Sequence, residues 1–426
     1  MRLIYTAIYY LFLPFILLRL FWKAREFPNY RKRWKERLGY LPIPKLSSSI
    51  WIHAVSLGET ITAIPLIKSI KNHYPQLNLI ITTTTATGSQ RVLQTFTKNE
   101  VYHVYMPYDY PNAIKKFLKH INPLIVLIME TELWPNILYY CEKRNIPVLI
   151  ANARISLKSA NGYKKIGNFV RNNMLNKVDL IAAQSKLDAE RYLNLGAEPS
   201  RVCVGGNIKF DIEIAKNLIA EGLKLRASWG NDRAIWIAAS THEGEEEQVL
   251  QALKAIKKNI LNILLVLVPR HPERFQKVSE LCKRLGFEVI SYKKQETCLP
   301  TTDIVIGDTI GDLLLLYAAS DVAFVGGSLS NVGGHNLLEP AALALPIITG
   351  NYLSNFQEIS RLLDEANALI RVNNAEELAN SVIGLFRNKE TRVKRGKAGL
   401  KVIEQNKGAL NKLMQWVESH LTKNAV

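Results

Sequence analysis

The sequence predicts an α/β protein with two doubly wound parallel sheets in tandem, each forming a Rossmann-like domain. The chain has 426 residues, 48% of them hydrophobic, so it can bury more than one core. From residue 45 onward, short apolar runs alternate with amphipathic stretches, which is typical of buried parallel strands joined by helices. This alternation begins again after residues 207–225, which places a domain boundary there.

Residues 1–22, MRLIYTAIYYLFLPFILLRLFW, are expected to form a membrane-associated segment. Within residues 1–40, nine Lys and Arg accompany two Glu, a net +7 of the total charge of +18, and no small-residue cleavage site follows the apolar run. Residues 3–18 are fewer than the roughly 20 that a spanning helix needs and include Pro14, so shallow insertion and a full span both remain open. The basic flank favours a cytoplasmic location for the rest of the chain. A buried helix of a soluble domain is the alternative.

The two domains are expected at residues 23–212 and 213–405, and residues 406–426 form a helix that could cross back to the first domain. The strands expected in the first domain are SIWIHAV (49–55), LNLIITTTT (77–85), PLIVLIM (123–129), IPVLIANA (146–153) and VDLIAAQS (178–185). The strands expected in the second are AIWIAAS (234–240), NILLVLVPR (262–270), FEVISY (287–292), DIVIGD (303–308), DVAFVGG (321–327) and LPIITG (345–350).

Glu59 follows the first strand, in a turn that Gly58 makes tight. In open α/β sheets, ligands bind beyond the carboxyl ends of the strands. The N-terminus of the helix that Glu59 enters favours an ionised carboxylate, which can accept a proton from a hydroxyl nucleophile. An acidic residue that only stabilises the helix start is the alternative.

Charged residues also follow other strands. Glu130 and Glu132 come after the strand at residues 123–129, and we expect one of them to be structural and the other to face the ligand. Lys209 follows a small-residue turn close to the domain boundary. Their repeated position after strands indicates a site at these ends.

The segment LVPRHPERF places Pro269, Arg270, His271 and Arg274 after a strand, an arrangement suited to binding an anion through charge-assisted hydrogen bonds. Glycine-bearing turns in AASTHEGEEEQVL, IGDTIGDLLLLY and FVGGSLSNVGGHNLLEP would allow backbone N–H groups to approach phosphate. None of them is a GxGxxG fingerprint or a Walker A loop, which disfavours NAD-linked and P-loop chemistry. Glu339, after the last turn, suits a carboxylate that accepts hydrogen bonds from ribose hydroxyls.

The net charge and the cysteines limit the classes of partner. A charge of +18 indicates an anionic partner, which could be nucleic acid, an acidic lipid surface or a phosphorylated substrate. The basic run lacks interleaved base-stacking aromatics, so no nucleic acid is expected. The four cysteines are far apart and form no CxxC pattern, which predicts free thiols and neither disulfides nor a zinc site.

Several motifs together resemble those of one enzyme family. The segments VSLGET, TTTTATGS, YMPYDYP, METELWPN, IANARIS, NIKFD, STHEGEE, VPRHPERF, GDTIGDL and FVGGSLSNVGGHNLLEP occur in this order. The chain is similar over essentially its whole length to the 3-deoxy-D-manno-octulosonic acid (Kdo) transferases of lipopolysaccharide and lipid A assembly. The resemblance implies a GT-B fold with two Rossmann-like domains.

The resemblance also implies the reaction and the residues that perform it. An inverting glycosyltransferase would move Kdo from CMP-Kdo to the 6′-hydroxyl of a tetraacylated, bisphosphorylated lipid A precursor (lipid IV-A), with no cofactor and no metal. Glu59 would be the general base, and Glu130 and Lys209 would stabilise the transition state. The residues implied in CMP-Kdo binding are Pro269, Arg270, Ile310, Gly311, Asp312, Asn336, Leu337, Leu338 and Glu339. Asp312 departs from the family, where glutamate is more usual.

The expected location is the bacterial inner membrane, with the catalytic domains on its cytoplasmic face and anionic lipids as partners. One alternative is another GT-B glycosyltransferase that uses a UDP-sugar and a different lipid-linked acceptor. The other is a basic membrane-surface binding protein without catalysis, in which Glu59 would have no special role. The number of Kdo residues transferred, the acyl-chain preference and the oligomeric state are left open by the sequence.

Overall fold

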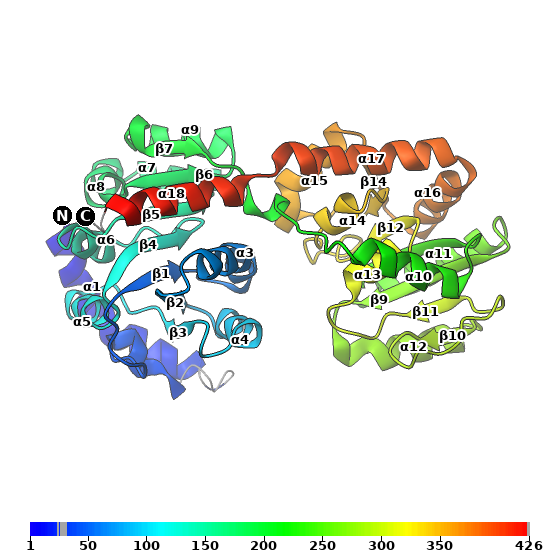
Figure 1. Cartoon of the computed structure of the whole chain (residues 1–426), viewed down its shortest axis with the longest axis horizontal. Coiled ribbons are helices and arrows are strands. Elements are labelled where there is room, and N and C mark those ends of the chain that lie inside the picture. The colour runs from blue at the N-terminus through cyan, green and yellow to red at the C-terminus, as the bar shows by residue number, and fades with distance from the viewer. Residues whose placement is uncertain (24, 26–31, 424–426) are drawn as a thin grey trace. The chain divides into compact units, whose positions relative to one another are not determined.

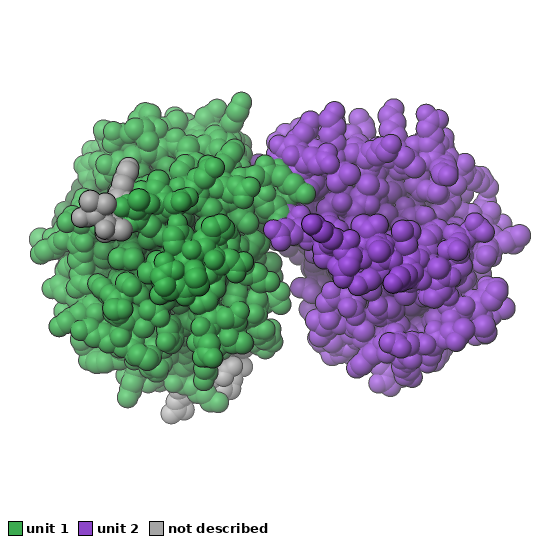
Figure 2. Space-filling model, in the orientation of Figure 1, with its two compact units in different colours: residues 1–211, 407–426 green, residues 212–406 purple. Residues whose placement is uncertain are grey.

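The computed structural model describes residues 1–23, 25 and 32–423 and divides the chain into two compact units (Figure 2). Unit 1 consists of Met1–Asp211 and Lys407–Val426, and unit 2 consists of Ile212–Asn406. The expected boundaries, after residues 212 and 405, differ from these divisions by one residue each.

Unit 1 is built on a parallel sheet with the strand order β3-β2-β1-β4-β5-β6-β7 (Figure 1). Its strands are β1 (Ser49–His53), β2 (Asn78–Thr83), β3 (Tyr102–Tyr105), β4 (Pro123–Met129), β5 (Val148–Ala153), β6 (Leu180–Ala183) and β7 (Val202–Val204). Its helices are α1 (Arg2–Lys23), η1 (Trp34–Leu38), α3 (Leu57–His73), α4 (Ala86–Thr95), α5 (Pro111–Ile121), α6 (Pro135–Glu142), α7 (Leu157–Lys164), α8 (Gly167–Asn173), η2 (Leu175–Lys177), α9 (Lys186–Asn194), η3 (Pro199–Arg201), η4 (Ile208–Phe210) and α18 (Ala409–Lys423). Strand order reverses between β1 and β4, so this is a doubly wound sheet.

Unit 2 repeats the plan, with the strand order β10-β11-β9-β8-β12-β13-β14, again parallel. Its strands are β8 (Ala234–Thr241), β9 (Ile263–Pro269), β10 (Val289–Ser291), β11 (Ile304–Ile306), β12 (Val322–Val325), β13 (Ile347–Thr349) and β14 (Leu369–Arg371). Its helices are α10 (Leu218–Trp229), α11 (Glu245–Lys257), η5 (Pro272–Arg274), α12 (Phe275–Arg284), α13 (Leu313–Ala318), α14 (Leu338–Ala342), η6 (Ser354–Phe356), α15 (Gln357–Glu365), α16 (Ala375–Arg387) and α17 (Lys389–Asn406). The predicted fold class of two parallel-sheet Rossmann-like domains is confirmed.

Each sheet is buried on both faces, because consecutive strand residues pack into different cores. In β1, Trp51 enters one core and contacts Phe117, with ring centroids 4.9 Å apart, while Ile50 and Ile52 enter the core on the other face. Continuous apolar runs are therefore the correct signal for these strands. The same alternation sends Trp236 of β8 to one face of the second sheet.

The chain returns to unit 1 through α18. Ala409, Leu413 and Val417 of this helix are buried in the core that α3 also covers. The carboxylate of Asp211 accepts hydrogen bonds from the backbone N–H groups of Gly408 at 2.6 Å and Leu410 at 2.7 Å. Asp211 thus fixes the start of α18 beside the point where the chain first leaves unit 1.

Helix α1 lies along unit 1 and is attached to it at several points. Asn136 Oδ1 accepts hydrogen bonds from the Arg2 guanidinium at 2.8 Å and from the Thr6 hydroxyl at 3.0 Å. Further along the helix, the ring of Tyr10 meets that of Tyr110 edge-on, at 5.5 Å between centroids. One face of α1 is therefore part of unit 1.

The other face of α1 is apolar and exposed. By length and composition α1 could cross a membrane, although Pro14 lies inside it. The large apolar side chains of α1 that are more than half exposed are Leu3, Ile4, Ile8, Leu11, Phe12, Phe15, Leu18 and Trp22.

The basic run after α1 is only partly a solvated flank. Residues 24 and 26–31 of this run lie outside the described residues. In η1, Glu36 and Arg37 are buried, Glu36 pairs with Arg33 at 2.6 Å, and Arg37 donates to the Thr84 carbonyl at 2.9 Å. Arg37 is therefore not available to the anionic lipids expected as partners of this basic flank, because its side chain is buried within unit 1.

Candidate active site

Glu59 lies in the first turn of α3, beyond the carboxyl end of β1. Ser56 caps this helix by accepting a hydrogen bond from the Glu59 N–H at 3.4 Å. In return, the Glu59 carboxylate accepts hydrogen bonds from the Val55 N–H at 2.6 Å and the Ser56 hydroxyl at 3.2 Å. This reciprocal pattern is a variant of the capping box in which the Val55 N–H takes the place of the Ser56 N–H. The structural role that was the alternative for Glu59 is therefore present, and it also fixes the position of the carboxylate.

The protonation of Glu59 differs from the sequence expectation. Burial raises its pKa to about 7, and the negative charges of Glu130 and Glu132 add to the rise, while the Val55 hydrogen bond opposes it. The expectation that the helix N-terminus would hold this group firmly ionised is therefore wrong. A carboxylate with a pKa near neutrality is well matched to accept a proton at physiological pH.

Glu130 and Glu132 follow β4 and have different surroundings. The Trp134 indole N–H donates to Glu132 Oε2 at 2.6 Å, and burial raises the pKa of Glu132. Glu130 adopts a left-handed backbone conformation, with φ 57°, and within the described residues its carboxylate has no hydrogen-bond or ion-pair partner. Strain of this kind is concentrated at functional sites. Glu130 is thus the carboxylate left available at this strand end.

Lys209 lies on η4, just after β7. Ile208 and Phe210 on either side of it are buried, and Asn207 Oδ1 accepts a hydrogen bond from the Lys209 N–H at 3.1 Å. The Ile208 N–H donates to Asn152 Oδ1 at 3.0 Å, which ties η4 to the end of β5. Unit 1 therefore places Glu59, Glu130 and Lys209 at the carboxyl ends of its strands.

Arg270 in unit 2 directly follows β9, whose last residue is Pro269. Its backbone N–H donates to the Thr241 carbonyl at 3.0 Å, and its side chain is exposed. Arg274, expected to bind the same anion, instead pairs with Glu246 at 3.0 Å and Glu243 at 3.1 Å. The sequence interpretation is wrong for Arg274, since its charge is already neutralised.

Two histidines that sequence reasoning did not assign lie beside Arg270. The Nε2 atoms of His242 and His335 are 2.8 Å apart, and their rings stack with centroids 5.0 Å apart. Burial, with Arg270 as the next cause, lowers the pKa of His335 to about 4. The pair is therefore neutral near pH 7, with one imidazole donating to the other. Both follow strands, but local sequence does not show that they meet, because they are 93 positions apart in the chain.

Glu245, also missed, connects the loops that carry these histidines. Its buried carboxylate accepts hydrogen bonds from the N–H groups of Gly327 at 2.7 Å, Ser328 at 2.9 Å and Leu329 at 2.9 Å. It also accepts one from the His242 N–H at 3.0 Å. The first acidic residue of the EEEQ segment therefore joins the ends of β8 and β12.

The second assigned group, Ile310 to Asp312, follows β11, the neighbour of β9 in the sheet. Gly311 has φ 105°, a conformation that favours glycine, and Ile310 beside it is 82% exposed. Asp312 precedes α13 and lines a cavity of about 530 Å³ together with Thr309 and Tyr292. The turn is thus open to a ligand on the side of its backbone.

The third assigned group begins at Asn336 and ends at Glu339. Asn336 donates to Glu339 Oε1 at 3.0 Å and accepts a hydrogen bond from the Leu338 N–H at 3.1 Å. The side chains of Leu337 and Leu338 are buried, so these residues can offer a ligand only their backbone. Burial raises the pKa of Glu339, while Asn336 and Arg270 oppose the rise, which places Glu339 within the field of Arg270.

Among the residues that the structure describes, the titratable side chains form no metal site of ordinary composition. Across residues 1–23, 25 and 32–423, no three His, Cys, Asp or Glu side chains gather as a set of ligands.

Known proteins resemble the chain over nearly its full length. A family model described as 3-deoxy-D-manno-octulosonic-acid transferase (kdotransferase) matches residues 32–212, and one described as glycosyl transferases group 1 matches residues 234–402. A 3-deoxy-D-manno-octulosonic acid transferase of Haemophilus influenzae is 42% identical over 429 residues, covering 99% of each chain. One of Bordetella pertussis is 30% identical and covers 89% of each chain.

Among solved structures, the UDP-GlcNAc 2-epimerase from Neisseria meningitidis is similar in fold. It covers 87% of this chain and 100% of its own, with a TM-score of 0.58 and 13% sequence identity. At that identity the likeness concerns the fold alone, and it agrees with two Rossmann-like units of the GT-B class.

Proposed function

Because the chain belongs to the 3-deoxy-D-manno-octulosonic acid (Kdo) transferase family, we propose that it transfers Kdo from CMP-Kdo to the 6′-hydroxyl of a tetraacyl lipid A precursor, lipid IV-A. The chain is a CMP-Kdo-dependent glycosyltransferase, as its 42% identity to a transferase over 99% of both chains supports. One observation carries the proposal: the Glu59 carboxylate, with a pKa raised to about 7, is fixed beyond the end of β1.

In the proposed reaction Glu59 acts as the general base of an inverting transfer. It accepts the proton of the acceptor hydroxyl while the hydroxyl oxygen bonds to the anomeric carbon of Kdo. The bond from that carbon to the phosphate oxygen breaks, and cytidine monophosphate leaves with the electron pair. Because attack and departure occur on opposite faces of the carbon, its configuration is inverted.

Charge that develops on the leaving phosphate is stabilised by fixed cations and dipoles. Lys209 and Arg270 are the cations proposed for this role, and Glu130 supports the developing positive charge on the sugar. The backbone N–H groups of Ile310–Asp312 and Asn336–Glu339 bind the cytidine monophosphate group, and the Glu339 carboxylate accepts hydrogen bonds from the ribose. We propose that no metal ion takes part, so excess EDTA is expected to leave the rate unchanged.

The acceptor explains why the chain carries α1. A tetraacyl lipid stays in the bilayer, so the enzyme must work at its surface. The attached face of α1 and its exposed apolar face support a helix that lies in the plane of the membrane, on the cytoplasmic side of the inner membrane. Anionic lipids would be attracted by the net charge of +18.

The deciding experiment incubates the full chain with CMP-Kdo and lipid IV-A in mixed micelles and identifies the product by mass spectrometry. A mass gain of one or more Kdo residues is expected with CMP-Kdo and none with UDP-sugars. CMP should also raise the melting temperature of the protein, and UDP should not. Absence of any Kdo transfer by folded wild-type protein would refute the proposal.

A further inference from the structure

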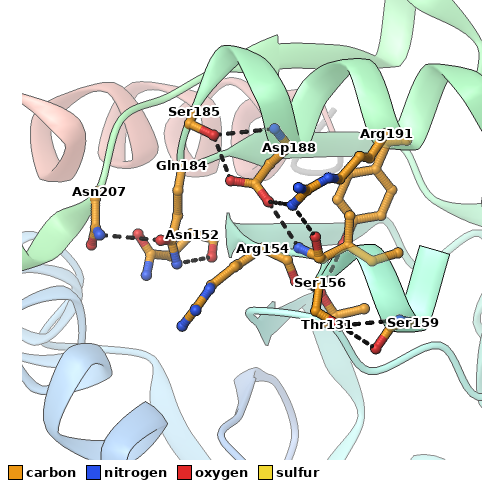
Figure 3. Close-up of polar contacts among 12 residues, drawn as sticks. Thr131, Asn152, Arg154, Ser156, Ser159, Gln184, Ser185, Asp188, Arg191 and Asn207 are labelled. Atoms are coloured by element: carbon orange, nitrogen blue, oxygen red, sulfur yellow. Dashed lines mark hydrogen bonds and ion pairs between the residues drawn. The ribbon is translucent and has the colours of Figure 1, made fainter. Parts of the chain in front are cut away.

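Arg154 is a cation at the carboxyl end of β5 to which no role is assigned above. It follows the last residue of the strand, Ala153, and its side chain is exposed. Figure 3 shows this side chain extending away from a network of polar contacts, with its guanidinium meeting none of the residues drawn. Across the described part of the chain, the guanidinium has no hydrogen-bond or ion-pair partner.

The backbone around Arg154 is held on both sides. The Thr131 hydroxyl donates to the Arg154 carbonyl, and Thr131 directly follows Glu130. The next peptide is bound by two residues one turn apart on α9: Asp188 Oδ1 accepts from the Ile155 N–H at 3.0 Å, and Arg191 donates to the Ile155 carbonyl at 2.7 Å. The protein therefore fixes the backbone of Arg154, while the guanidinium at the end of its side chain stays available to a ligand.

The same network fixes the turn that carries Lys209. Gln184 donates to the Asn152 carbonyl at 2.9 Å and accepts from Asn207 at 3.1 Å (Figure 3). Asn207 in turn accepts a hydrogen bond from the Lys209 N–H at 3.1 Å. Asn152 is fully buried in a left-handed conformation, with φ 54°, and its amide Nδ2 has no partner among the described residues. A strained backbone and a buried polar atom without a partner both cost free energy, and such costs are characteristic of functional sites.

The carboxylates at this edge of the sheet would repel an anionic substrate, so binding such a substrate here requires a cation. Glu59, Glu130 and Glu132 are close enough that the last two raise the pKa of the first. Within the described residues, none of the three is ion-paired to Lys or Arg. Both substrates are anionic, and a substrate anion brought here would meet repulsion unless cations faced it. An arginine presents a planar fork of donors that suits phosphate and carboxylate groups.

We infer that Arg154 binds an anionic group of a substrate, either a phosphate of the lipid acceptor or the carboxylate of the donor sugar. This inference rests on the function proposed above. Arg154 acts in binding and Lys209 in the chemical step. The polar layer of Asn152, Gln184 and Asn207, together with Asp188 and Arg191, fixes the backbone segments that carry both cations.

The test measures kcat and KM for both substrates in Arg154→Gln, Arg154→Lys and the control Arg144→Gln. Arg144 is an exposed arginine in the turn between α6 and β5, so the control removes the same charge from the segment that precedes the strand. Arg154→Gln is expected to raise one KM at least tenfold with kcat changed less than threefold. Arg154→Lys should recover part of the loss, and Arg144→Gln should match wild type. Melting temperatures establish that each variant is folded.

The same KM values show which substrate, the lipid acceptor or the donor sugar, carries the anionic group that Arg154 binds. If the acceptor provides it, KM for lipid IV-A rises and the difference from wild type disappears with an acceptor stripped of phosphates. If the donor provides it, KM for CMP-Kdo rises while the affinity for CMP alone, measured calorimetrically, stays the same.

Unchanged KM values for both substrates, a loss confined to kcat, or an equal loss in Arg144→Gln would each overturn the inference. If Arg154→Gln does not fold, Arg154→Lys decides, and wild-type KM values in that variant would also overturn it. Failure of the wild-type protein to transfer Kdo would instead refute the proposed function.

Discussion

At the scale of single residues, Glu59 combines a structural and a chemical role. It completes the capping box of α3 and presents the carboxylate proposed as the general base. Glutamine can occupy the same position of a capping box, so the two roles can be separated experimentally.

Glu59→Gln is expected to keep the melting temperature and to lower kcat by roughly 10²- to 10⁴-fold, the usual contribution of a general base. In wild type the base is active when deprotonated, so kcat should fall as the pH decreases below about 7 and level off above it. Single-turnover rates from pH 5.5 to 8.5 check this. A wild-type rate that does not respond to pH across this range, or a fully active variant, would exclude Glu59 as the base.

The His242–His335 pair makes a prediction about stability. The pKa of His335 is about 4 in the folded protein, against 6.5 for a free histidine, so the unfolded chain binds more protons between these values. Folding stability should therefore be lost as the pH falls from about 6.5 toward 4. Other charged or titratable groups that act on the pair are Glu245, Arg270, His271 and Arg274.

This prediction is checked by melting temperatures of wild type and His335→Gln from pH 4 to pH 8. Both proteins should have lower melting temperatures in acid, because other buried histidines such as His53 and His103 also have lowered pKa values. Between pH 6.5 and pH 4 the melting temperature of the variant should fall less than that of wild type. Parallel curves would show that the pair does not titrate with unfolding.

Glu59, Glu130 and Arg270 stood out in the sequence because each follows a strand, where local pattern and position coincide. The roles of the site residues, and the inclusion of Ile310, Leu337 and Leu338, came from the family resemblance. Glu245 and the histidine pair could not be predicted, since their partners are more than 80 positions away in the chain. Arg274 was wrongly predicted to bind an anion for the same reason: local sequence does not show that its charge is paired with Glu246.

At the scale of elements, the long buried strands were predictable and three short ones were not. β3, β7 and β14 have three or four residues each and lie at the edges of their sheets. Such segments are strands mainly because a neighbour pairs with them, so their own composition carries little signal. β10 is equally short and also lies at an edge, but it was predicted from the run FEVISY. The strands that precede Glu59, Glu130 and Arg270 were all predicted, whereas β7, which precedes Lys209, was not.

The membrane role proposed for α1 leads to a prediction at the scale of elements. Leu11 and Leu18, each 69% exposed, are expected to enter the lipid surface. Replacing both with Gln should weaken binding to anionic vesicles by at least tenfold, since each buried Leu side chain contributes about 1.5–3 kcal/mol. Cosedimentation with vesicles measures this, and CMP affinity should not change.

The matched control for α1 is Leu261→Gln, an exposed leucine in unit 2. It should bind vesicles as wild type does. Equal loss in the control, or no loss in the double variant, would show that α1 does not mediate membrane binding.

At the scale of the whole molecule, unit 1 is assembled from two separate parts of the chain. Leu413 of α18 is 2% exposed in the core of unit 1. Leu413→Ala should therefore cost unit 1 about 2–5 kcal/mol, as for other buried leucines. Denaturant unfolding should show the transition of unit 1 shifted and that of unit 2 unchanged.

Lys412→Ala, at the exposed neighbouring position of the same helix, is the control and should leave both transitions in place. A shift confined to unit 2 would contradict the assignment of α18 to unit 1.

The return of α18 also determines the order in which the protein can form during synthesis. Unit 2 is continuous in the chain and can complete its folding as soon as it leaves the ribosome. Unit 1 begins first but must wait for α18, which is made after unit 2, and until then Ile208 and its apolar neighbours lack their cover. A chaperone that shields such surface would therefore act on the half made first, throughout the synthesis of the half that follows it.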